Sequence, residues 1–98
     1  MMIKIHKSYR DVVAMCDKEL IGKKFEQGKS QLDLKPSFYE GDELTKEKIL
    51  ELLQNMAKED ATFNIVGEKS ISLALKTGII EKNGVKHISG IPYALVLV

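Results

Sequence analysis

The chain has 98 residues, of which 44% are hydrophobic and 30% are charged, and its formal net charge is +1. This length suits one domain, this composition excludes intrinsic disorder, and a near-neutral charge argues against a strongly electrostatic nucleic-acid binder. The single cysteine, Cys16, cannot form an internal disulfide, and the sequence shows no signal peptide and no apolar run of membrane-spanning length. We therefore expect one cytoplasmic domain over residues 1–98, with no cofactor and no membrane partner.

The first third of the chain has the short alternating runs that are typical of strands. Residues 2–7 predict a half-buried strand, and residues 11–16 predict a second strand that pairs with it as a hairpin. A turn is predicted over residues 17–21. Residues 23–34 contain two alternating pieces on either side of Gly28, which predict a second hairpin.

Helical periodicity dominates the middle of the chain. Pro36 and the polar residues 40–43 are expected to interrupt regular structure. From Thr45, a predicted N-cap, apolar residues recur at helical spacing and predict an amphipathic helix of about four turns. A second helix is predicted to begin at residue 67 or 68 and to end at residue 77, followed by Gly78 in a left-handed conformation. Its predicted buried residues are Ile71, Ala74 and Leu75.

The end of the chain returns to strand patterns. A turn at Asn83-Gly84 is followed by residues 85–89 and 92–98, which predict one bent strand or two. Strands at both ends and helices between them predict an α+β fold: a mixed or antiparallel sheet of two terminal strand regions, with two helices packed on one face. We expect the final strand to pair with the amino-terminal hairpin. Its apolar residues 94–98 suit a central strand, or an edge strand that a second copy of the molecule covers.

One segment combines the features of a helix entrance and of an anion site. Glycine lets the backbone come close to a ligand where a helix exposes unpaired N–H groups, and a lysine and a serine follow. The candidate anion- or ligand-binding residues are Asn64, Gly67, Glu68, Lys69 and Ser70. Ordinary helix capping, with Glu68 at the positive end of the helix dipole, explains the same pattern without a ligand. Both interpretations stay open at this point.

Two weaker candidates come from charge and from a bend. The first 30 residues carry seven basic and four acidic groups, so a basic surface is predicted at Lys4, Lys23 and Lys24, although a solvated surface is the plainer interpretation. Near the last strand, the flexible Gly90 and the conformationally restricted Pro92 precede the aromatic hydroxyl of Tyr93. A bend of this kind often shapes a site. The candidate pocket residues are His6, His87, Gly90, Pro92 and Tyr93.

Known chemical motifs are broken or missing in this sequence. The segment Gly28-Lys29-Ser30 lacks the glycine spacing of a P-loop. His6, His87 and Cys16 lack the paired spacing of zinc ligands, so no metal site is predicted. A buried, structural cysteine is the better interpretation of Cys16. We assign no catalytic residue.

Several short segments together carry a family resemblance. They are Lys4-Ile-His6, Cys16-Asp17, Gly22-Lys-Lys-Phe-Glu26 with Gly28, Asn64-Ile-Val-Gly-Glu68, and Gly90-Ile-Pro-Tyr-Ala94. In this order and at these distances they resemble the archaeal family catalogued as domain of unknown function 424, over nearly the whole chain. The resemblance implies an archaeal, cytoplasmic, stand-alone domain, and it brings no activity, substrate or cofactor. Tyr93 stands where many relatives have histidine, which argues against an acid–base role at this position.

Three functions are compatible with these observations. The leading hypothesis is a non-enzymatic binding module for RNA or a ribosome-associated partner, using Lys4, Lys23, Lys24 and the helix entrance at Gly67. The second is a small enzyme or an anion-binding protein with its site near that entrance. The third is a homodimer that pairs through its last strand. The first hypothesis is favoured because the amino-terminal part is positively charged and the sequence lacks a nucleophile and a base at the spacing of a catalytic motif.

Overall fold

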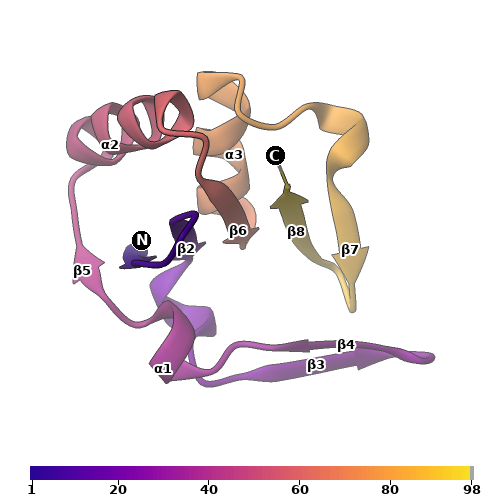
Figure 1. Cartoon of the computed structure of the whole chain (residues 1–98). Helices are drawn as coiled ribbons and strands as arrows, with labels where there is room; N and C mark the ends of the chain where they lie inside the picture. Colours follow the sequence, from indigo (N-terminus) through magenta and orange to yellow (C-terminus); the bar gives the residue numbers. More distant parts are fainter. Residues whose placement is uncertain (98) are drawn as a thin grey trace.

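The computed structural model describes residues 1–97, and within them it contains a six-stranded sheet, a separate two-stranded hairpin and three α-helices (Figure 1). The strands are β1 (Met2–His6), β2 (Val12–Cys16), β3 (Lys24–Gln27), β4 (Ser30–Asp33), β5 (Asp42–Glu43), β6 (Thr62–Val66), β7 (Lys86–Ile88) and β8 (Ile91–Val96). The helices are α1 (Pro36–Tyr39), α2 (Lys46–Lys58) and α3 (Glu68–Thr77), with 3-10 turns η1 (Lys18–Leu20) and η2 (Lys82–Gly84). The predicted α+β class is confirmed.

The large sheet has the strand order β5-β1-β2-β6-β8-β7. Strands β2 and β6 are parallel, and the other neighbours are antiparallel. Strand β6, between the two long helices, was not predicted, and it separates β8 from the amino-terminal hairpin. The predicted pairing of the last strand with that hairpin is therefore wrong. Strand β8 lies between β6 and β7, but β7 pairs only with residues 91–93. The apolar residues 94–96 pair with β6 alone among the described strands, so the central alternative for this run is wrong. Its cover by a second copy stays a prediction, and Val98 lies outside the described residues.

Helices α2 and α3 cover one face of the sheet, as predicted. Val13 and Met15 from β2 and Phe63 from β6 share a buried cluster with Leu53 of α2 and Ala74 of α3. Burial of apolar surface at about 25 cal/mol per Å² makes this cluster the main stabilising feature of the fold.

The ends of the two long helices agree with their sequence signals, but one buried face does not. Thr45 caps α2, because its hydroxyl accepts a hydrogen bond from the Lys48 backbone N–H at 3.3 Å. Gly78 ends α3 in the left-handed conformation. Leu75 was predicted to be buried and is 37% exposed, whereas Leu73 is buried. The reason is the rotation of α3, which turns its Ser70 side toward the interior.

The opposite face of the sheet is covered by α1 and by the β3–β4 hairpin, which confirms the second predicted hairpin. In Figure 1 this hairpin extends along the lower side of the molecule, while α2 and α3 lie at the top. The prediction that Pro36 and residues 40–43 interrupt regular structure is right for residues 40 and 41 and wrong for the others. Pro36 begins α1, where its missing N–H needs no partner, and β5 pairs through its backbone with Met2 and Ile3 of β1.

The last two strands form a hairpin, which confirms the two-strand alternative. Its turn contacts the tip of the β3–β4 hairpin. The Ser89 backbone N–H donates to the Gln27 side-chain oxygen, and the Ser89 hydroxyl donates to the Glu26 carbonyl, both at 2.7 Å. These contacts fix the two hairpins to each other. Within the described chain, no helix combines the length and the apolar composition that a membrane crossing requires.

Candidate functional site

A buried carboxylate organises the edge of the sheet where the parallel strands end. Asp17 follows β2 directly, and its N–H donates to the carbonyl of Val66, the last residue of β6. The Asp17 side chain is 3% exposed. It accepts hydrogen bonds from the backbone N–H of Lys69 at 3.0 Å, from the backbone N–H of Ser70 at 2.8 Å and from the Ser70 hydroxyl at 2.7 Å. Asp17 therefore caps α3 from a distant part of the chain.

This cap occupies the helix entrance that the sequence marked as an anion site. Two N–H groups of the first turn of α3 already bind the Asp17 carboxylate, so they are not available to a ligand. Gly67 has φ of 106°, and a Cβ atom there would lie 2.3 Å from Asp17 Cγ. Glycine is thus needed both for its conformation and for the close approach of Asp17. Sequence reasoning missed Asp17 because it read residues 17–21 only as a turn.

A groove of about 590 Å³ lies beside α3, between this helix, the first residue of the chain and the start of α2. Its walls come from the first residue of the chain, from the junction of β5 and α2, and from α3. They include Met1, Leu44, Lys46, Lys69, Ser72 and Lys76. Leu73 and one carboxylate, that of Glu68, complete the walls. Three lysines against one glutamate make this groove electropositive.

The basic and hydroxyl groups of the groove come from facing elements. Lys69, Ser72 and Lys76 are spaced by three and four residues, so they lie on one side of α3, with the outer two about 10 Å apart along the helix axis. Lys46 is the first residue of α2 and faces them across the groove. All four side chains belong to exposed residues.

Ion pairing leaves most of this charge uncompensated. The Lys69 ammonium lies 3.9 Å from a carboxylate oxygen of Glu19, and both side chains are more than half exposed. Such exposed pairs are worth little, about 0–1 kcal/mol. Among residues 1–97, no acidic side chain forms an ion pair with Lys46 or Lys76.

A second, smaller depression of about 210 Å³ adjoins the groove. Here Gly67, Glu68 and Lys69, from the predicted anion site, meet Gly90 and Pro92, from the predicted pocket. Its other lining residues are Asp17, Glu19, Leu20 and Ile91. The structure thus brings parts of two predicted sites together, and Glu68 and Lys69 line both hollows. Ser70 lines neither hollow, because it is buried and its hydroxyl donates to Asp17.

The other candidate pocket residues do not converge. Tyr93 of β8 is in register with Val66 of β6, and this row continues through β2 to Met2 at the start of β1. His6 is the last residue of β1, about 13 Å further along that strand. His6 stacks on the Phe38 ring at 4.5 Å.

His87 lies apart from Tyr93, whereas Asn64 is close to it on the neighbouring strand. His87 is paired with Pro92, and Tyr93 is the next residue along β8. The side chains of His87 and Tyr93 therefore point to opposite faces of the sheet. Asn64 lies in the middle of β6, next to Ala14 of β2 and Leu95 of β8. Asn64 therefore lies on the same face as Tyr93, two residues away in register, whereas the two histidines lie apart from both.

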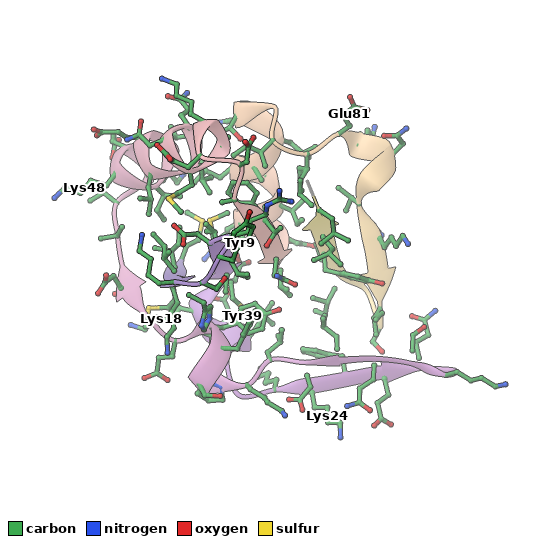
Figure 2. All side chains as sticks on the ribbon, in the orientation of Figure 1. Tyr9, Lys18, Lys24, Tyr39, Lys48 and Glu81 are labelled. Carbon is green, nitrogen blue, oxygen red and sulfur yellow. The ribbon has the colours of Figure 1, made fainter. Side chains whose placement is uncertain are left out.

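The three lysines of the predicted basic surface also lie apart from the groove. The Lys4 ammonium donates to the Ser37 carbonyl of α1 at 2.8 Å. Lys24 lies 4.0 Å from Glu26 on the same strand, and Lys23 is exposed at the base of the hairpin. Figure 2 shows Lys24 on the β3–β4 hairpin, on the far side of the molecule from α2 and α3.

Cys16 is buried, and its thiol is expected to be unreactive. Burial, and then the carboxylates of Asp17 and Glu19, raise the pKa of its thiol to about 12. A nucleophilic cysteine needs a lowered pKa and solvent access, so the structure supports the buried, structural interpretation. In the part of the chain that the structure describes, no three histidine, cysteine or acidic side chains gather as metal ligands would.

Comparisons with known proteins place this architecture in a family. A family model described as "Protein of unknown function (DUF424)" matches residues 6–98. The fold is similar to that of a crystal structure of an uncharacterized conserved protein from Methanopyrus kandleri, with a TM-score of 0.86 and 20% sequence identity. The similarity covers 97% of this chain and 88% of that one. No curated protein matches the sequence.

Proposed function

The chain belongs to the DUF424 family, whose description gives no function, and we propose that this member is a non-enzymatic module that binds RNA. The observation that carries the proposal is the groove of about 590 Å³ with Lys46, Lys69 and Lys76 in its walls and one carboxylate, that of Glu68. Neutralising phosphates with lysines and releasing their counterions is the main source of affinity for nucleic acids.

The arrangement of side chains favours binding over catalysis. The candidate acid–base residues are spread over the sheet, and the one thiol is buried with a raised pKa. General acid–base and nucleophilic catalysis both need groups within hydrogen-bond reach of each other, in a site that substrate can enter. The lysines of the groove need only an anionic partner.

The lysines also set the expected mode of recognition. Lysine is a flexible point charge, while reading a base edge with two parallel hydrogen bonds favours the guanidinium fork of arginine. No arginine is found among the described residues that line the groove. We therefore expect contacts to phosphate and little dependence on base sequence.

The test is a titration of a labelled single-stranded RNA of about 20 nucleotides, longer than a typical binding site of such proteins, followed by fluorescence anisotropy across a salt series. The test variant combines Lys46→Gln, Lys69→Gln and Lys76→Gln. The matched control combines Lys48→Gln, Lys58→Gln and Lys82→Gln, which removes the same charge from exposed positions outside the groove.

For the unchanged protein, the logarithm of the binding constant should fall linearly with the logarithm of the salt concentration. The groove variant should lower the magnitude of that slope by about 2, since each lost phosphate contact on a single strand removes about 0.7. The control should stay near the unchanged protein. Absence of RNA binding at low salt, or equal effects of the two variants, would overturn the proposal.

A further inference from the structure

The geometry points to a more specific ligand for the lysine-lined groove: the polyphosphate of a nucleotide, carried either at the 5′ end of an RNA or by a free nucleoside triphosphate. This inference rests on the proposed function, because it names the part of the nucleic acid that the groove holds. It is separable from that function, because a protein can bind RNA through its internal phosphates alone.

The first argument is the convergence of the donors on one place. Ser72 lies three residues after Lys69 and four before Lys76, so its exposed hydroxyl sits between the two lysines on the same side of α3. The lysine stems are flexible, so their ammonium groups can reach inward across the roughly 10 Å that separates their backbone positions. Lys46 reaches the same hollow from α2. These groups surround a compact anion better than an extended one.

The second argument is the density of charge that the groove can balance. An internal stretch of single-stranded RNA presents one charge for each nucleotide, spread along the strand, whereas a terminal triphosphate concentrates several charges within one nucleotide. Glu68 in the wall offsets one lysine, so a lone phosphate gains little. A polyphosphate carries several negative charges close together, so it can interact with the remaining positive charge of the groove.

The third argument is the size and lining of the groove. A volume of about 590 Å³ lies within the range of small-molecule sites, about 300–1,000 Å³, and so suits a nucleotide. Met1 and Leu44 are half-buried and Leu73 is buried, so each side of the groove has an apolar part. These apolar side chains can pack against the sugar or the base while the lysines hold the phosphates.

The experiment compares three RNAs of one sequence, labelled at the 3′ end, that carry a 5′-triphosphate, a 5′-monophosphate or a 5′-hydroxyl. The triphosphate RNA should bind about tenfold more tightly than the hydroxyl RNA, as expected when the end group adds one set of charge-assisted contacts. Combining Lys69→Gln with Lys76→Gln should remove this difference. Combining Lys48→Gln with Lys58→Gln should preserve it.

A second arm separates the two sources of the polyphosphate. Adenosine triphosphate, guanosine triphosphate and inorganic triphosphate are each added as competitors of the triphosphate RNA. If the nucleotides compete at concentrations close to the dissociation constant of the triphosphate RNA, a free nucleotide is the ligand. If they compete only at far higher concentrations, the ligand is the RNA end.

Two outcomes are negative and differ from each other. Salt-dependent RNA binding with equal affinity for the three 5′ ends overturns this inference and leaves the proposed function standing. No binding of any RNA, combined with tight binding of a free nucleoside triphosphate that depends on Lys69 and Lys76, overturns the proposed function and supports the inference. No binding of either class overturns both.

Discussion

The Asp17 carboxylate and the Ser70 hydroxyl, 53 residues apart in the chain, are joined by a hydrogen bond of 2.7 Å in the interior of the protein. This bond ties the end of β2 to the first turn of α3. It also decides which side of α3 faces outward: with Ser70, Ile71 and Ala74 buried, Ser72 and Lys76 are turned toward the groove. The shape of the candidate site thus depends on a residue outside the lysine cluster.

The cap can be tested by replacing Asp17 with alanine. The change removes the acceptor of three hydrogen bonds and leaves two backbone N–H groups of α3 without their partner, that of Ser70 in a buried place and that of Lys69 in a half-buried one. We expect a loss of about 2–4 kcal/mol in the free energy of unfolding, measured by urea denaturation. Glu51→Ala, an exposed change on α2, should alter it by less than about 0.5 kcal/mol. Similar losses in both variants would show that Asp17 does not stabilise the helix entrance.

The second prediction concerns Gly67, whose φ of 106° and contact with Asp17 leave no room for a side chain. Gly67→Ala should destabilise the protein by more than about 1 kcal/mol, because the new Cβ atom forces either the helix entrance or Asp17 to move. Gly84→Ala is the control, since a Cβ atom there meets nothing within 4 Å. Thermal unfolding followed by circular dichroism measures both. A Gly67→Ala midpoint equal to that of the control would contradict the close packing of Asp17.

Much of the fold was predictable because its signals are local. The N-cap at Thr45 and the left-handed Gly78 are read from neighbouring residues, and the structure has both. Strand β6 was missed although Phe63 and Ile65 alternate with more polar residues, because a run of five residues between two helices is easily taken for a connection. The partner of β8 then could not be identified, since strand order depends on contacts between distant segments.

The candidate site was harder to predict for the same reason. Of the groove lysines, only Lys69 stood out, because it follows a glycine at a helix entrance. Lys46 and Lys76 come from helix positions where a lysine is ordinarily a solvated surface residue, and only the packing of α2 beside α3 brings them together. Lys4 and Lys24 carried the sequence argument through their clustering along the chain, which does not imply clustering in space.

The third prediction is a loss of stability in alkaline solution. Burial first, and then nearby charges, raise the pKa of the Cys16 thiol and of the Tyr39 hydroxyl, each to about 12, from 9.0 and 10.0. The unfolded chain loses these protons first as the pH rises, so it binds fewer protons than the folded chain between about pH 9 and pH 12, and stability falls across that window. Each group contributes at most about 1.4 kcal/mol per pH unit.

The measurement for this prediction is the free energy of unfolding in urea at a series of pH values from 8 upward. The slope above pH 9 should be smaller in Cys16→Ala, and the slope above pH 10 smaller in Tyr39→Phe. Comparing slopes separates titration from the constant cost of a changed core. A slope that neither substitution alters would show that these two groups do not titrate as their burial requires.

The fourth prediction concerns the exposed ion pair between Glu19 and Lys69, 3.9 Å apart. Glu19→Gln frees the Lys69 ammonium from its carboxylate, so it should strengthen RNA binding about twofold, which corresponds to the few tenths of a kcal/mol that an exposed pair is worth. The stability of the fold should change by less than about 0.5 kcal/mol, because both side chains are largely in solvent. Fluorescence anisotropy at low salt measures the affinity.

Two comparisons decide whether a gain in affinity comes through Lys69. Glu81→Gln removes the same charge at an exposed position outside the groove, so it reports the effect of net charge alone. In a protein that already carries Lys69→Gln, Glu19→Gln should give no gain beyond that of Glu81→Gln, because the ammonium group it would release is gone. An equal gain with and without Lys69 would mean that Glu19 acts through the overall field of the protein, and it would remove Lys69 from the proposed groove contacts.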